Sequence, residues 1–227
     1  MMSLHRNAEG HFASSDDAFR HWDEDGEVSG RCSKCHTAEG LPFFLEEGVT
    51  IAFDPSNSLE CTSCHDLNDP DFALYPVTEV SFPSGATVGF DEDSTSNMCL
   101  HCHQGRESTV SVNNAIMAAD VGEDEVSESL TFRNPHYYSA GASWFGTDVQ
   151  GAYEYEGMEY NSEYEHTRQF NECNDCHSPH QGGVVNIMEC TECHENVETA
   201  ADLQLIRAHP DDAEPFDYDG DGDDAEP

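Results

Sequence analysis

The sequence predicts a loop-rich fold with short α-helices and one or two small β-hairpins, in which bound groups replace most of an aliphatic core. Leu, Ile, Val and Phe make up only 39 of the 227 residues, and 47 acidic against 8 basic residues give a formal net charge of −39. This composition is typical of disordered chains. The chain nevertheless contains 22 aromatic residues and 10 cysteines, which disordered chains usually lack.

All ten cysteines belong to five segments of the form Cys-x-x-Cys-His, here numbered 1 to 5 in chain order. They are Cys32-Ser-Lys-Cys35-His36, Cys61-Thr-Ser-Cys64-His65, Cys99-Leu-His-Cys102-His103, Cys173-Asn-Asp-Cys176-His177 and Cys190-Thr-Glu-Cys193-His194. In this motif the thiols bond to the vinyl groups of a c-type haem, and the histidine is the proximal iron ligand. Given 13 histidines in the chain, the chance that one follows every pair is roughly one in a million.

Three other uses of paired cysteines fit this pattern less well. Structural zinc sites with four cysteines consume the pairs two at a time, and five is an odd number. Disulfide frameworks need no histidine after each pair. Redox-active Cys-x-x-Cys motifs usually occur singly, on a thioredoxin-like fold. The sequence therefore predicts a pentahaem c-type cytochrome.

Five porphyrins would explain the composition, because they supply apolar material that the aliphatic residues do not. Trp144, Phe145, Tyr153 and Tyr155 are expected to pack on porphyrin faces and edges. We therefore expect a mostly irregular chain, with its short helices and hairpins wrapped around five covalently bound haems. Residues 1–210 would form this cytochrome domain.

Local patterns predict a few regular elements, and the long gap between segments 3 and 4 is the only place for haem-free structure. Alternation and turn residues predict hairpins over 153–160 and 77–88. Short helices are expected at 15–22, 110–119 and 197–208.

Eight histidines remain after the five proximal ones, so every iron can have a second histidine. Electron carriers close both axial positions, whereas haem enzymes keep one open. His180 follows segment 4, His136 lies in an aromatic stretch and His166 precedes segment 4, so these three are good distal candidates. His21 lies on the predicted N-terminal helix and His11 precedes it. Weaker candidates are His5, His101 and His209, and the six methionines are a less favoured alternative.

The acidic tail, residues 211–227, resembles the start of a calcium loop. Asp217, Asp219 and Asp221 alternate before a glycine, as in EF-hand loops, but the glutamate expected at the twelfth position is absent. A solvated tail is the alternative to calcium as a further cofactor.

The net charge would repel nucleic acid and anionic membrane surfaces, and no apolar run is long enough to span a membrane. Lys34 is the only lysine, and this acidic bias is typical of proteins from salt-rich environments; an acidic secreted protein is the alternative. Such haems are attached outside the cytoplasmic membrane, so we expect a secreted, extracellular or cell-surface protein, or a periplasmic one. No signal peptide is visible at the N-terminus.

Stretches between residues 10 and 222 resemble multihaem cytochromes of extracellular electron transfer. They are Gly10-His11, Ala18-Phe-Arg-His21-Trp22, Cys99 to Ser108, Asn134-Pro-His-Tyr-Tyr138, Trp144-Phe-Gly-Thr147, Gly151-Ala-Tyr-Glu-Tyr155, Cys176-His-Ser-Pro-His180 and Asp217 to Gly222. The resemblance implies closely spaced bis-histidine haems that conduct electrons without substrate turnover. The distal ligands it implies are His11, His21, His136, His166 and His180.

The resemblance also implies partners. Some cytochromes of this kind polymerise into filaments, the cytochrome nanowires, in which a histidine of one subunit completes a haem of the next; His11 is the expected residue here. The partners would then be copies of the chain, beside redox-partner cytochromes or extracellular acceptors. A soluble shuttle is the other form of electron carrier.

A reductase of a small oxyanion, such as nitrite, is the competing function. Such an enzyme needs an open iron, and many use a lysine ligand, yet Lys34 lies inside segment 1. The net charge would also repel an anionic substrate. We therefore expect an electron-transfer protein and not an enzyme.

Overall fold

The computed structural model describes residues 26–56, 59–122, 124–164, 166, 170–181 and 184–206. The chain divides into two compact units, residues 1–184 and residues 185–227. The predicted helix at 15–22 and the acidic tail at 211–227 lie outside the described residues.

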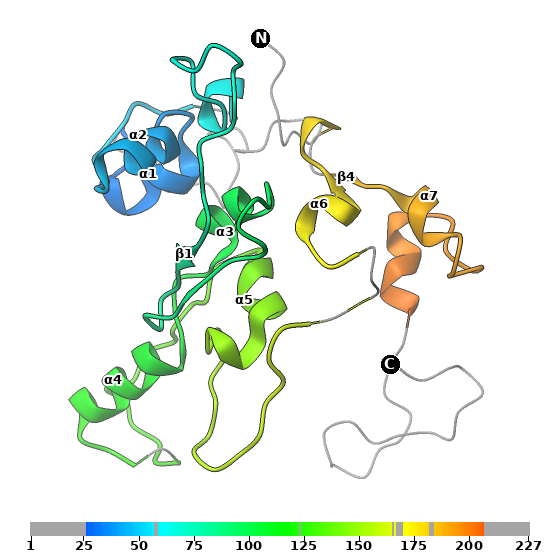
Figure 1. Ribbon diagram of the computed structural model, residues 1–227. Helices are drawn as coiled ribbons and strands as arrows, with labels where there is room; N and C mark the ends of the chain where they lie inside the picture. Colours follow the sequence, from blue (N-terminus) through cyan, green and yellow to red (C-terminus); the bar gives the residue numbers. More distant parts are fainter. Residues whose placement is uncertain are drawn as a thin grey trace. The chain divides into compact units, whose positions relative to one another are not determined.

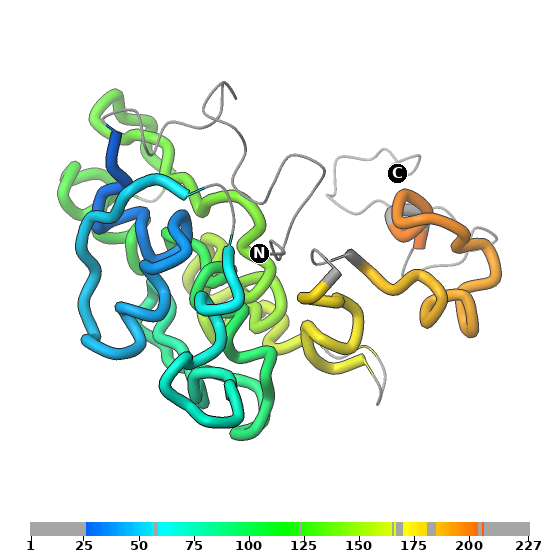
Figure 2. The backbone as a smooth tube through the Cα atoms, turned by 90° about the horizontal axis from the view of Figure 1, so that it is seen from above, coloured from blue at the N-terminus to red at the C-terminus, as the bar shows by residue number. Residues whose placement is uncertain are grey.

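Short helices joined by long loops make up the first unit (Figure 1, Figure 2). Its α-helices are α1 (Gly30–His36), α2 (Gly40–Glu47), α3 (Asn97–His103), α4 (Thr109–Ala119), α5 (Ala140–Phe145) and α6 (Cys173–Cys176). Its 3₁₀ turns are η1 (Cys61–Ser63), η2 (Gly146–Asp148) and η3 (Pro179–Gln181). In the second unit lie α7 (Ile187–Cys190) and the 3₁₀ helix η4 (Ala200–Leu205). The expectation of short helices and much loop is confirmed.

One of the two predicted hairpins is present. Strand β1 (Val80–Ser81) pairs antiparallel with β2 (Thr87–Val88), within the predicted range of 77–88. The turn between them has Gly85 at φ 92°, a left-handed conformation that glycine adopts without strain. A further pair of short strands, β3 (His177–Ser178) and β4 (Val184–Val185), was not predicted from the sequence.

The hairpin predicted at 153–160 is wrong in its strands and correct in its turn. Residue 157 is a glycine at φ 84°, and the Met158 amide donates to the Tyr155 carbonyl at 3.2 Å. No strand forms on either side. The reason is that side chains satisfy the main chain: the Tyr155 amide donates to the Tyr160 hydroxyl and the Glu154 amide to Thr109 Oγ1.

The helix predicted at 110–119 is confirmed as α4, which begins at a reciprocal cap. The Ser108 hydroxyl accepts from the Ser111 amide, and the Ser111 hydroxyl accepts from the Ser108 amide. The helix predicted at 197–208 is shorter and is a 3₁₀ helix, η4. Asp202 caps it by accepting from Thr199, and these hydrogen bonds lower the pKa of the Asp202 carboxyl.

A small hydrophobic core lies among β1, α3 and α5. Its buried residues are Val80, Phe82, Leu100, Ala142, Phe145 and Val149. Phe145 is only 2% exposed and meets Phe82 edge to face, with ring centroids 6.0 Å apart. Trp144 packs against this cluster through Phe90. The expectation that Phe145 packs on a porphyrin is therefore wrong, because this ring lies inside the polypeptide core.

Helices α1 and α2 lie side by side and hold segment 1 in place (Figure 1). A Cβ atom at Gly40 would lie 2.0 Å from the Ser33 carbonyl oxygen, so only glycine permits this approach. Ser33 is fully buried, and its hydroxyl donates to the Ile51 carbonyl at 2.6 Å. Segment 1 is thus fixed by main-chain contacts on both sides.

Candidate haem-binding site

Each of the five segments contains a helical turn between its two cysteines. Segments 1, 3 and 4 lie on α1, α3 and α6. In segments 2 and 5, the amide three residues after the first cysteine donates to its carbonyl, at 3.2 Å in both cases. Residues three apart on a helical turn are neighbours on one face, which is what bonding to one porphyrin edge requires. All ten cysteines are free thiols.

Segment 3 lies between segments 1 and 4. The Cys102 thiol donates a hydrogen bond to Cys35, which lowers the pKa of Cys35 to about 7 and raises that of Cys102. The Cys173 thiol donates in the same way to Cys99, so the pKa of Cys99 falls and that of Cys173 rises. The cysteine edges of segments 1 and 4 therefore both adjoin that of segment 3.

Hydrogen bonds hold segment 4 against the loop that leads into segment 3. The Asn174 amide donates to Ser96 Oγ at 3.0 Å, and its side-chain nitrogen donates to Thr95 Oγ1 at 2.7 Å. The Ser94 hydroxyl donates to the Glu172 carboxylate. These contacts join residues almost 80 positions apart in the sequence, since Asn174 and Ser96 differ by 78.

Segment 2 is joined to segment 1 through the loop that follows α1. The Ser63 hydroxyl, fully buried, donates to the Ala38 carbonyl at 2.7 Å. Cys64 is half-buried, and this burial raises the pKa of its thiol to about 11. Segments 1 to 4, which span residues 32 to 177, thus form one connected cluster in the first unit.

Two predicted distal histidines lie next to predicted proximal ones. The ring centroids of His36 and His136 are 5.9 Å apart, with the ring planes at 84°. Those of His65 and His180 are 6.2 Å apart, with the planes at 21°. His136 comes from the loop before α5 and His180 from η3, so each pair joins distant parts of the sequence.

Two predicted proximal histidines donate to main-chain carbonyls. The Nδ1 atom of His65 lies 2.7 Å from the Phe72 carbonyl oxygen, and that of His103 lies 2.7 Å from the Tyr138 carbonyl oxygen. A carbonyl oxygen only accepts, so Nδ1 carries a proton, and in the neutral imidazole this leaves Nε2 with a lone pair for a metal.

The two residues whose carbonyls accept these hydrogen bonds have the same unusual backbone conformation, with positive φ. Phe72 and Tyr138 are both left-handed, each at φ 54°. For a bulky side chain this conformation costs of order 1–3 kcal/mol. Sequence reasoning missed both residues, because aromatic side chains give no signal for a left-handed turn.

The structure describes some of the remaining predicted site residues and not others. His166 lies near the rings of Tyr164 and Phe170, His177 begins β3, and His194 follows α7. His11 and His21, the weaker candidates His5 and His209, and the calcium candidates Asp217, Asp219 and Asp221 lie outside the described residues.

His101, a weak candidate by sequence, has an unexpected environment. It is only 6% exposed, and its ring meets that of Phe44 edge to face at 5.6 Å. Burial, with the nearby Lys34 ammonium, lowers the pKa of its imidazole to about 4. The imidazole is therefore neutral near pH 7.

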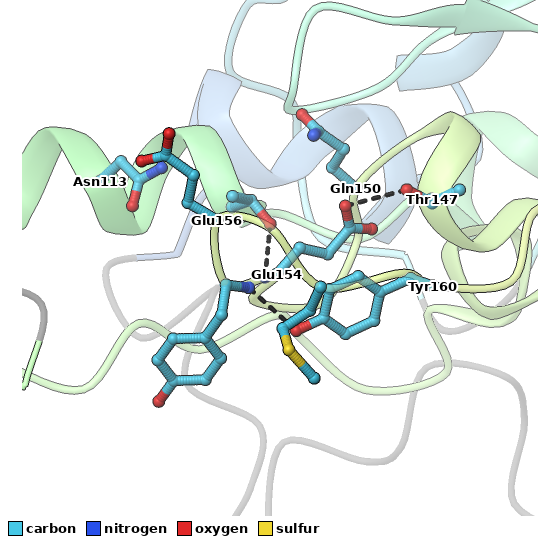
Figure 3. A pocket seen from close by; sticks show the side chains of 9 residues that line it. Asn113, Thr147, Gln150, Glu154, Glu156 and Tyr160 are labelled. Carbon is cyan, nitrogen blue, oxygen red and sulfur yellow. Dashed lines mark hydrogen bonds between the residues drawn. The ribbon is translucent and has the colours of Figure 1, made fainter.

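A cavity of about 340 Å³ lies away from the cysteines, beside α4 and the 153–160 turn (Figure 3). Glu154 accepts a hydrogen bond from the Thr147 hydroxyl at 2.9 Å, and Asn113, Gln150 and Tyr160 complete much of the lining (Figure 3). The Glu154 amide also donates to Thr109 Oγ1 and the Tyr155 amide to the Tyr160 hydroxyl, and none of the described residues that line the cavity is a histidine or a cysteine. No residue of segments 1 to 5 is among the residues that line the cavity.

In the part of the chain that the structure describes, no three His, Cys, Asp or Glu side chains cluster closely enough to hold a metal ion by themselves. A search of the same residues finds no helix with the length and hydropathy that a membrane crossing requires.

Comparison with known proteins identifies two cytochromes of Geobacter sulfurreducens as relatives of this chain. The C-type polyheme cytochrome OmcB of Geobacter sulfurreducens, in two strains, is 27% identical over 176 residues, covering 63% of this chain and 22% of OmcB. The C-type polyheme cytochrome OmcC of the same species is 29% identical over 171 residues, covering 61% of this chain and 21% of OmcC. The chain is a distant relative of polyhaem c-type cytochromes.

The matches span about a fifth of the length of these relatives. No family model and no solved structure matches the chain. Both relatives are c-type polyhaem cytochromes, which agrees with the five Cys-x-x-Cys-His segments of this chain.

Proposed function

We propose that the protein is a pentahaem c-type cytochrome that carries electrons through five bis-histidine haems. The observation that supports this most strongly is the spacing of the histidine pairs. A ligating nitrogen lies about 2 Å from its metal and a ring centroid roughly 1 Å further, so two imidazoles on one iron have centroids about 6 Å apart. The pairs His36 with His136 and His65 with His180 lie at 5.9 and 6.2 Å.

The chain's own residues would hold the haems in three ways. The two cysteines of each helical turn form the thioether bonds, and the following histidine binds the iron. Bound haem supplies a one-electron iron couple. Carbonyl acceptors at Phe72 and Tyr138 orient the imidazoles of His65 and His103 and increase their basicity, as outer-shell partners of metal-binding histidines generally do.

Closed axial positions favour electron transfer over catalysis. An iron held by His36 and His136, or by His65 and His180, leaves no site for a substrate oxygen or nitrogen atom. The neighbouring cysteine edges of segments 1, 3 and 4 support haems close enough for electrons to pass between them. The remaining irons would take their second ligands from His166, His11 and His21.

The charge and the resemblance suggest where the protein works. A net charge of −39 suits an extracellular, salt-rich setting in which ions screen the self-repulsion. We propose secretion to the cell surface or beyond, with assembly into a conductive filament through His11 as one form and a soluble shuttle as the other. Electron micrographs of the purified protein in concentrated salt distinguish these forms.

Electron paramagnetic resonance of the ferric protein, combined with haem quantification, tests the central proposal. Five haems per chain that are all low-spin are the expected result. A stoichiometric high-spin signal would contradict bis-histidine ligation and favour the oxyanion reductase. Fewer than five covalent haems in fully matured protein would contradict the reading of the five segments.

A further inference from the structure

His101 occupies a position that packing alone does not explain. It lies on α3 between the two cysteines of segment 3, with 6% of its surface exposed. Among the residues that the structure describes, no group forms a hydrogen bond with its Nδ1 atom, which is itself buried. Buried polar groups in native proteins nearly always have a partner, so an unmatched one points to a group that the polypeptide does not supply.

The helix directs His101 away from the haem of its own segment. Successive residues of an α-helix are roughly 100° apart around the axis, so His101 and His103 leave α3 about 200° apart. His103 already donates its Nδ1 proton to the Tyr138 carbonyl and is the proximal ligand of segment 3. Both histidines therefore cannot face the same porphyrin.

The surroundings of His101 fix its backbone firmly. Its carbonyl oxygen accepts from Cys35 Sγ at 3.6 Å and from Gln104 Nε2 at 3.1 Å, and its ring meets the edge of Phe44. The side chain thus lies where segment 1 meets segment 3. An imidazole held on a rigid helix beside a second cysteine pair is well placed to reach a porphyrin other than its own.

We propose that His101 is an axial ligand of a haem iron other than the iron bound by His103. This inference rests on the proposed function, and it adds a ligand that lies outside the set His11, His21, His136, His166 and His180. Its consequence is that one of the N-terminal histidines is not needed within its own chain and is released for another role.

The test uses the full, haem-loaded chain. In His101→Phe, which keeps an aromatic ring of similar size, one haem per chain should change from low-spin to high-spin by paramagnetic resonance, with the covalent haem count unchanged. In His101→Gly, added imidazole should return that haem to low-spin. The control is Met98→Leu, a buried position on the same helix, which should leave every haem low-spin.

A conservative variant covers the case in which these changes impair maturation. His101→Met exchanges an imidazole for a thioether, which should raise the midpoint potential of one haem while keeping all haems low-spin. Low-spin haems throughout in His101→Phe, with unchanged potentials in His101→Met, would overturn the proposal. A wild-type chain without covalent haem would instead contradict the proposed function itself.

Discussion

The Nδ1 atom of His103 lies 2.7 Å from the carbonyl oxygen of Tyr138, only two residues from His136, whose ring meets that of His36. A single turn over residues 134–139 therefore contacts a histidine of segment 3 through its main chain and a histidine of segment 1 through a side chain. A displacement of this turn would therefore change the surroundings of His103 and those of His36 at the same time.

The left-handed Tyr138 gives the first prediction. Tyr138→Pro locks φ near −65° and turns the carbonyl away from His103, whereas Tyr138→Gly accepts φ 54° without strain. A hydrogen bond of about 1 kcal/mol that favours the ferric iron lowers the potential by roughly 40 mV. The proline variant should therefore raise the midpoint potential of one haem by about that amount in a redox titration.

The glycine variant serves as the control for this experiment. It keeps the carbonyl and removes the left-handed strain, so its potentials should match those of the wild type, and its melting temperature should be equal or higher. Identical potentials in the proline and glycine variants would show that the carbonyl does not act on His103.

The second prediction concerns the histidine pairs. His136→Ala and His180→Ala should each convert one haem from low-spin to high-spin, and the double variant should convert two, because the proposed function assigns the two pairs to different irons. Paramagnetic resonance counts the converted haems directly. Tyr137→Ala, an exposed neighbour of His136, should convert none. If either histidine variant stayed entirely low-spin, that pair would not share an iron.

Haem content gives the third prediction. The mature protein should exceed the mass of its polypeptide by roughly 3 kDa, the mass of five covalent haems. Replacing Cys173 and Cys176 by Ala should remove one haem and disturb segment 5, which begins only 17 residues later. Asn174→Ala, a change in the spacer that keeps both cysteines, should retain five haems. Intact-mass spectrometry distinguishes these outcomes.

Salt dependence is the fourth prediction. With 47 carboxylates and 8 cationic side chains, self-repulsion grows as the Debye length rises to roughly 30 Å at 0.01 M salt. The melting temperature should fall on dilution from molar to low salt and recover when salt returns. A neutral osmolyte at equal osmolality is the control and should not restore it. A constant melting temperature across this range would argue against the salt-adapted interpretation.

The sequence contains much of the local information and little of the long-range information. Segment positions, α4 with its serine cap and the β1–β2 hairpin follow from local patterns. The burial of His101 and the Tyr138 carbonyl contact depend on residues 35 positions apart or more, and no periodicity encodes them. The low aliphatic content predicted that Phe145 would pack on a porphyrin. Instead it lies in a small hydrophobic core, because a few apolar residues from β1, α3 and α5 are enough to bury it.

The adjacent thiols of segment 3 impose an order on biogenesis. Cys35 meets Cys102, and Cys99 meets Cys173, so a haem-free chain that reached this arrangement in an oxidising compartment would form two disulfides between different segments. Under the proposed function, those disulfides would consume thiols that three separate haems require. We therefore expect the proposed haems to be attached before these pairs of thiols come together in the fold.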